Sequence, residues 1–147
     1  MDGGQGNGAQ GLYQIAYDSV VALPFGEAGQ EELRRVMESS RRRNAEAGIT
    51  GVLRYDGAYF LQVLEGPRAA VEATMQRIRC DPRHTDIRLL NAGPLERRDF
   101  GDWSMVLVTE VEMAAARERN PDLLEVYPFR TAEVVHSMRL VLEGPAG

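Results

Sequence analysis

The chain has 147 residues, of which 44% are hydrophobic, and it carries a formal net charge of −5 at pH 7. This length suits one domain, and this composition suits a globular core. The acidic balance argues against nucleic-acid binding, which usually needs a basic face. All 17 basic residues are arginines, which excludes Schiff-base chemistry and a phosphate-binding lysine.

Cysteine and histidine are scarce in this chain. Cys80 is the only cysteine, and His84 and His136 are the only histidines. So few histidines and cysteines argue against a metal site built from these residues. A single cysteine allows no internal disulfide, which favours a reducing, cytoplasmic location. We expect Cys80 to be a passive, partly buried thiol away from the chemistry. No apolar run approaches the roughly 20 residues of a membrane-spanning helix, and residues 1–11 read as a flexible tail rather than a signal peptide.

The first elements are a strand and a long helix. Leu12 to Ser19 reads as a strand, and Glu27 to Ala47 predicts a helix that ends at the capping glycine Gly48. Spacings of three and four residues define one stripe of this helix, which consists of Leu33, Val36, Met37, Ser40 and Asn44.

A hairpin and a second helix follow. Ile49 to Tyr55 and Ala58 to Leu64 read as strands, and Asp56-Gly57 between them is a strong signal for a two-residue turn. The second of these strands is apolar on both faces, which suits a central position in a sheet. Gly66-Pro67 opens the second helix, and Asp81-Pro82 ends it. Its inner stripe is Val71, Met75 and Ile78.

The fourth strand is predicted over Ile87 to Leu90, and the fifth over Trp103 to Val108, with a polar connection from Asn91 to Gly101. The order β-α-β-β-α-β-β predicts an α+β fold, a ferredoxin-like sheet with one added strand and two helices on one face. Helical patterns from Val111 to Leu142 predict cap helices on the other face. The last of these patterns has an apolar stripe of Val134, Val135, Met138 and Val141/Leu142.

Gln62 lies in the most apolar stretch of the chain, where an amide without partners would cost about 1–3 kcal/mol. Strand alternation puts Gln62 on the same face as Phe60. Tyr17 and Asn44 could converge on it between the first helix and the sheet. Taken singly, Asn44 could be a solvated helix end, Tyr17 ordinary packing and Gln62 the partner of a bulge. Together the three indicate a polar binding site.

Several motifs follow one another in order between Leu12 and Val108. They are Tyr17-Asp18-Ser19, Arg43-Asn44, Ile49 to Leu53, Tyr55-Asp56-Gly57, Phe60 to Pro67, Asp81 to His84 and Arg97 to Met105. In order and spacing they resemble the BLUF domain, a blue-light sensor that uses a flavin. Arg43 stands where members of that family vary, and Leu61 stands where an aromatic residue is frequent.

The resemblance implies a noncovalent flavin, FAD or FMN, between the two first helices. Asn44 would bind the pyrimidine edge of its ring, and Gln62 would bridge Tyr17 and the N5/O4 edge. The ring would be lined by Val36, Ser40, Leu53, Phe60 and Ile78. The ribityl and phosphate end would lie near Asp81, Arg83 and His84. Trp103 and Met105 would be alternative neighbours of Gln62.

The function that the resemblance implies is a non-enzymatic photoreceptor, with residues 12–108 as the sensor and 109–147 as a helical output segment. Tyr17 would give an electron and a proton to the excited flavin, and the network around Gln62 would then change. The output would reach an unidentified downstream protein or act through a homo-oligomer. The alternatives are a small ferredoxin-like hydrolase and an interaction module without a cofactor. No Gly-rich, anion-binding loop opens the first helix, which argues against the hydrolase.

Overall fold

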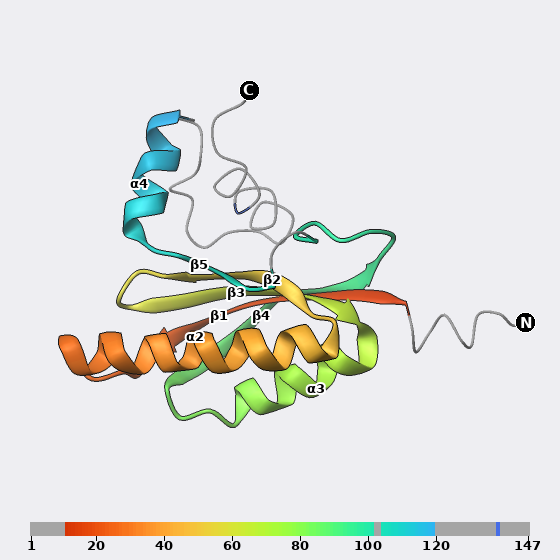
Figure 1. The fold of residues 1–147 in the computed structure, drawn as a ribbon, viewed down its shortest axis with the longest axis horizontal. Helices are drawn as coiled ribbons and strands as arrows, with labels where there is room; N and C mark the ends of the chain where they lie inside the picture. Colours follow the sequence, from red (N-terminus) through yellow and green to blue (C-terminus); the bar gives the residue numbers. More distant parts are fainter. Residues whose placement is uncertain (1–10, 102–103, 120–137, 139–147) are drawn as a thin grey trace, which may run out of the picture.

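The computed structural model describes residues 11–101, 104–119 and 138, and its centre is a five-stranded sheet (Figure 1). The strands are β1 (Leu12–Val21), β2 (Thr50–Tyr55), β3 (Tyr59–Pro67), β4 (His84–Leu95) and β5 (Val106–Val108). The helices are α2 (Glu27–Ala47), α3 (Arg68–Arg79) and α4 (Glu110–Arg119). None of the helices in these ranges is long and apolar enough to cross a membrane.

The strand order across the sheet is β4-β1-β3-β2-β5. β1 runs antiparallel to both β3 and β4, β2 runs antiparallel to β3, and β5 is added parallel to β2. This is the ferredoxin-like arrangement with one extra strand, so the predicted α+β fold is confirmed. β3 occupies the centre of the sheet, as its two apolar faces predicted.

The two faces of the sheet carry separate apolar clusters, and Figure 1 shows α2 and α3 on one face and α4 on the other. The cluster under α2 and α3 includes Tyr17, Leu33, Met37, Leu53, Phe60, Leu64, Val71, Met75 and Met105. The cluster on the α4 face includes Ala16, Val52, Leu61, Val63, Phe100, Val108, Met113, Ala116 and Met138. The predicted cap is therefore confirmed for α4 and Met138. The other members of the predicted C-terminal stripe, Val134, Val135, Val141 and Leu142, lie outside the described residues.

β4 is much longer than the sequence predicted. It extends from His84 to Leu95, so the polar connection expected from Asn91 onward was wrong for its first five residues, which form strand. These residues pair with the beginning of β1, where Leu12 lies opposite Leu95 and Ala16 opposite Asn91. β1 supplies main-chain partners on one side, and an edge strand tolerates polar side chains because its outer face meets water.

The other strand boundaries differ less. β1 continues two residues beyond the predicted end at Ser19, to Val21. β5 begins only at Val106, so Met105 lies just before the strand instead of within it. Trp103, which the sequence placed in the fifth strand, lies outside the described residues. The capping prediction for α2 is confirmed, because Gly48 adopts a left-handed conformation with φ of 74°.

A buried carboxylate fastens the segment before β5 to the sheet. Glu65, at the end of β3, is 0% exposed. Its Oε1 accepts from the main-chain N–H of Phe100 at 2.8 Å, and its Oε2 accepts from the N–H of Asp99 at 2.9 Å and from Gln14 Nε2 at 2.8 Å. Burial raises the pKa of Glu65, and these hydrogen bonds act in the opposite direction by favouring the carboxylate.

Arg98 adds a second attachment at the same place. Its guanidinium donates to the carbonyl oxygen of Gly48 at 2.7 Å and to Thr50 Oγ1 at 2.9 Å. Both acceptors lie at the start of β2 or just before it. Residues 98–100 are thus bound to the ends of β2 and β3, a few residues ahead of Met105.

We expect Glu65→Gln to lower the free energy of unfolding by about 1–3 kcal/mol at neutral pH, because an amide would turn an N–H₂ group toward a main-chain donor. Chemical denaturation monitored by circular dichroism measures the change. Glu72→Gln is the matched control, since the side chain of Glu72 is 52% exposed in a surface pair with Arg68. It should change the stability by less than about 0.5 kcal/mol. Equal effects of the two substitutions would contradict the role of Glu65.

Candidate functional site

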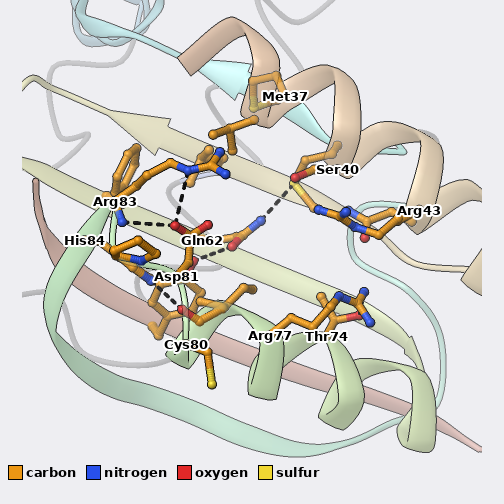
Figure 2. Close-up of a pocket in the computed structure, with 18 of the residues that line it drawn as sticks. Met37, Ser40, Arg43, Gln62, Thr74, Arg77, Cys80, Asp81, Arg83 and His84 are labelled. Atoms are coloured by element: carbon orange, nitrogen blue, oxygen red, sulfur yellow. Dashed lines mark hydrogen bonds and ion pairs between the residues drawn. The ribbon is translucent and has the colours of Figure 1, made fainter. Parts of the chain in front are cut away.

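A cavity of about 420 Å³ opens between α2, α3 and the sheet. Figure 2 shows Ser40 and Arg43 of α2 on one side, Thr74 and Arg77 of α3 on the other, and Gln62 of the sheet between them. The cavity is formed where the apolar stripes of the two helices separate over β1, β3 and β2.

Eleven of the residues that the sequence assigned to a binding site line this cavity. They are Tyr17, Val36, Ser40, Asn44, Leu53, Phe60, Gln62, Ile78, Asp81, Arg83 and His84. Met105 lines it as well, whereas Trp103 lies outside the described residues. Two of the simpler alternatives were wrong. Asn44 is 3% exposed and is no solvated helix end. The amide of Gln62 bonds to the side chains of Tyr17 and Met105, so it does not serve the main chain of a bulge.

The sequence reasoning missed seven further lining residues, which are Leu23, Met37, Arg43, Thr74, Arg77, Cys80 and Pro82. Thr74 could have been found, because it lies three residues after Val71 and four before Ile78 on the predicted inner stripe. The expectation for Cys80 was wrong. α3 ends at Arg79, so Cys80 follows the helix as an exposed thiol that lines the cavity.

Tyr17 and Gln62 form a hydrogen bond on the floor of the cavity. They lie directly opposite each other in the pairing of β1 with β3, and the Tyr17 hydroxyl donates to Gln62 Oε1 at 2.5 Å. In this arrangement the carbonyl end of the amide faces the phenol, which as a hydroxyl could also accept from an amide N–H. The amino end is then directed at Met105, with 3.5 Å between Gln62 Nε2 and the Met105 sulfur.

Tyr17 is kept as a neutral phenol by its surroundings. It is 3% exposed, and burial raises its pKa well above the usual range because the phenolate would lose its hydration. The negative charge of Asp81 acts in the same direction. Tyr17 is therefore a protonated phenol near neutral pH and can donate to Gln62.

His84 packs against Tyr17 beside the hydrogen bond between Tyr17 and Gln62. Its Nε2 lies 2.7 Å from the carbonyl oxygen of Ile78, which can only accept, so Nε2 carries a proton. On the other side of the ring, Nδ1 forms a hydrogen bond with the hydroxyl of Ser19, 2.7 Å away. The ring meets Tyr17 and Phe60 edge-on, with centroids 6.1 and 6.2 Å apart. His84 thus joins the last turn of α3 to β1 and fixes one wall of the cavity.

Three arginines lie at different places around the cavity (Figure 2). Arg83 pairs with Asp81 at 3.3 Å and with Glu32 at 3.7 Å, and its own side chain is 40% exposed. Arg43 and Arg77 also line the cavity. Guanidinium groups at an open rim suit an anionic group. No cluster of metal-ligating side chains occurs among the residues that the structure describes.

The polar and apolar groups of the cavity fit a flavin. Within the described part of the chain, the side-chain amide of Asn44 makes no hydrogen bond, although Asn44 is 3% exposed. An amide that lines the cavity without a hydrogen bond to the protein is available to a polar group bound there. The walls are apolar at Val36, Leu53 and Phe60. A flat apolar ring with a hydrogen-bonding edge and an anionic tail matches this distribution.

Comparison with known proteins identifies the family. The sequence profile described as "Sensors of blue-light using FAD" (BLUF) matches residues 12–106. The chain belongs to the BLUF family. It is therefore a member of a family of blue-light sensors that bind a flavin, as the order of its motifs predicted.

Relatives of this BLUF chain include much larger proteins. Photoactivated adenylate cyclase subunit beta of Euglena gracilis is 40% identical over 104 residues, which are 70% of this chain but 12% of that protein. The blue light- and temperature-regulated antirepressor BluF of Escherichia coli is 34% identical over 77 residues, or 52% of this chain and 19% of that protein. The chain thus spans only a small part of these relatives.

The dark-state structure of BlrB, a BLUF protein, has a size similar to that of this chain. It superposes with a TM-score of 0.76 at 35% identity, covering 89% of this chain and 97% of BlrB. The photo-activated state of BlsA gives a TM-score of 0.73 at 23% identity, which supports the fold alone. This chain therefore shares its fold with BlrB over nearly the whole length of the BlrB chain.

Tyr17→Phe should leave the alkaline rise in phenolate absorbance of the folded protein unchanged, because burial prevents Tyr17 from ionising. Spectrophotometric titration of the parent and the variant measures this. The same titration in denaturant is the control, since the unfolded variant must show one phenolate fewer than the five of the parent. A smaller rise in the folded variant would show that Tyr17 ionises in the native state.

Proposed function

We propose that this BLUF chain is a blue-light photoreceptor that binds one flavin noncovalently in the cavity between α2 and α3. The observation that carries the proposal is the hydrogen-bonded series Tyr17–Gln62–Met105 on the floor of that cavity. It joins a redox-active phenol, a reversible amide and the residue that leads into β5. We propose FAD as the flavin and regard FMN, which accompanies Klebsiella pneumoniae BlrP1 in one of its structures, as the alternative.

The cavity residues divide by chemistry. Asn44 and Gln62 offer amides to the polar edge of the ring. The ring itself would pack between apolar side chains of α2, the sheet and α3, which are Val36, Leu53, Phe60 and Ile78, with Ser40 at the margin. Asp81, Arg83 and His84 would lie toward the ribityl and phosphate end, where the guanidinium group of Arg83 is half-exposed and accessible to an anion.

The proposed photochemistry begins at Tyr17. A bound flavin would supply blue-light absorption and, when excited, an acceptor for one electron. Loss of an electron makes a phenol strongly acidic, and the proton of Tyr17 already lies in a hydrogen bond to Gln62 Oε1. Gln62 is therefore the group that first receives this proton, and Tyr17 recovers both the proton and the electron before the rearranged state is reached.

Gln62 can then change its orientation at little steric cost. The two ends of a primary amide are nearly isosteric, so reversal exchanges a donor for an acceptor while the shape stays the same. In the reversed amide the carbonyl oxygen would face the Met105 sulfur, which is only an acceptor. The contact between Gln62 and Met105 would be lost, and Met105 would no longer be held in its position.

The proposed output leaves through β5 and α4. Met105 directly precedes β5, which pairs with β2, and α4 begins two residues after β5 ends. Met113 and Ala116 of α4 pack on the face of the sheet opposite the cavity. A displaced Met105 would thus alter a surface on the far side of the molecule. We propose that this surface, as part of the output segment 109–147, acts on a separate protein or on a second copy of the chain and performs no catalysis itself.

The purified protein should be yellow, and blue light should shift its flavin absorption reversibly to the red. Absorption spectra in the dark, after illumination and during recovery measure this response. Chromatography of the flavin released by heat distinguishes FAD from FMN. A colourless protein, or a flavin spectrum that light leaves unchanged, contradicts the proposed function and favours the hydrolase or the cofactor-free module.

Gln62→Leu and Tyr17→Phe should each retain flavin and lose the normal red-shifted state. The first variant removes the reversible amide, and the second removes the proton and the electron donor. Tyr55→Phe is the matched control, because Tyr55 packs 5.5 Å from Phe60, measured between ring centroids, without lining the cavity. It should keep the full shift. A parent-like light response in Tyr17→Phe would exclude Tyr17 as the donor.

A further inference from the structure

Met105 lies between β3, β2 and α2. It is 2% exposed, and its sulfur faces the amide of Gln62 on β3. On β2, Gly51 has no side chain, and a Cβ atom there would lie 3.3 Å from the methyl carbon of Met105. From α2, the Nε–H of Arg41 donates to the main-chain carbonyl oxygen of Met105 at 3.1 Å. Gly51 only leaves room for the methyl group, and the thioether sulfur is a weak acceptor. Of the two hydrogen bonds that the described residues make to Met105, the one from Arg41 is therefore the stronger.

Arg41 lies on α2 next to the cavity without being part of its lining. Ser40, which precedes Arg41, and Asn44, three residues after Arg41, both line the cavity. The residue is exposed at the surface of α2, and its guanidinium reaches across to the segment that precedes β5. It therefore connects the helix that covers the cavity to the strand proposed to carry the output.

We propose that Arg41 is a positioning residue that holds Met105 with its sulfur against Gln62. Arg41 thereby sets how readily Met105 leaves this position. The inference rests on the proposed function, since it assigns to Arg41 the control of a light-driven change. Arg41 acts through Met105 and touches neither Gln62 nor the cavity. Its charge makes the hydrogen bond to the carbonyl stronger than a neutral one, although its exposure to solvent reduces the gain.

The first test needs no light. A buried methionine is oxidised by peroxide only when the structure opens locally, so the oxidation rate of Met105 reports how firmly it is held. Arg41→Leu should raise this rate about threefold to tenfold in the dark, the range expected for a partly exposed hydrogen bond. Cleavage after Arg98 and Arg117 gives one peptide with Met105 and Met113, and Met113, 1% exposed in the α4 cluster, is the internal reference.

Two variants serve as controls. Arg42 is the next residue of α2, exposed and without a hydrogen bond or ion pair in the described part of the chain, so Arg42→Leu should oxidise like the parent. Arg41→Lys keeps a charged N–H donor on a stem long enough to reach the carbonyl, so it should lie closer to the parent than to Arg41→Leu. If Arg41→Lys behaves like Arg41→Leu, the hydrogen bond is not the cause and the proposal is overturned.

The second test uses the light response. Arg41→Leu should retain flavin and the red shift, and its rate of dark recovery should differ from that of the parent by about threefold or more. Arg42→Leu should recover like the parent. Equal recovery rates in Arg41→Leu and Arg42→Leu overturn the proposal even if Met105 oxidises faster. A parent without any light shift contradicts the proposed function instead, and the oxidation rates then decide alone whether Arg41 holds Met105.

Discussion

The hydrogen bond between Tyr17 and Gln62 is the constraint on which the site depends. A buried amide must find partners for both of its ends, and the register of β1 with β3 places the phenol directly opposite. Burial raises the pKa of Tyr17 and so keeps it a phenol, which in this arrangement donates to the carbonyl end of the amide. The amino end must then point away from Tyr17, toward the cavity wall and Met105. One cross-strand pair thus sets the orientation of the Gln62 amide on the floor of the cavity.

The central strand β3 connects the cavity to the segment that precedes β5. Gln62 lies on its cavity face, whereas Glu65, with the opposite alternation, lies on the face that α4 covers. Glu65 binds the main chain at Asp99 and Phe100 and so fixes the start of the segment that contains Met105. The end of that segment is attached to α2 by the hydrogen bond of Arg41. A change at Gln62 therefore acts on a segment that Glu65 fixes at its start and that Arg41 attaches to α2 at Met105.

The sequence predicted the parts of this arrangement that depend on local periodicity. The stripe of α2, the two faces of β3 and the motif order were sufficient to bring Tyr17, Asn44 and Gln62 to one site. The boundaries of β4 could not be predicted in the same way, because its polar second half becomes a strand only by pairing with β1. Cys80 was misplaced because the end of α3 decides whether the residue faces the core or the rim, and no periodic signal marks that turn. The contact of Arg41 could not be predicted from local periodicity either, because its side chain bonds to a residue 64 positions away.

The contact between Gln62 and Met105 is the weakest in the polar network. A thioether is a poor acceptor, whereas the phenol of Tyr17 and the hydroxyl of Ser19 make strong hydrogen bonds to Gln62 and His84. A network in which every bond were strong would have one stable arrangement and would not respond to the orientation of one amide. The weak contact allows Met105 to leave when the amide reverses, and the hydrogen bond from Arg41 prevents it from leaving before that. The physical requirement for a switch at this site is therefore a buried, fully partnered amide next to a neighbour that it holds only weakly.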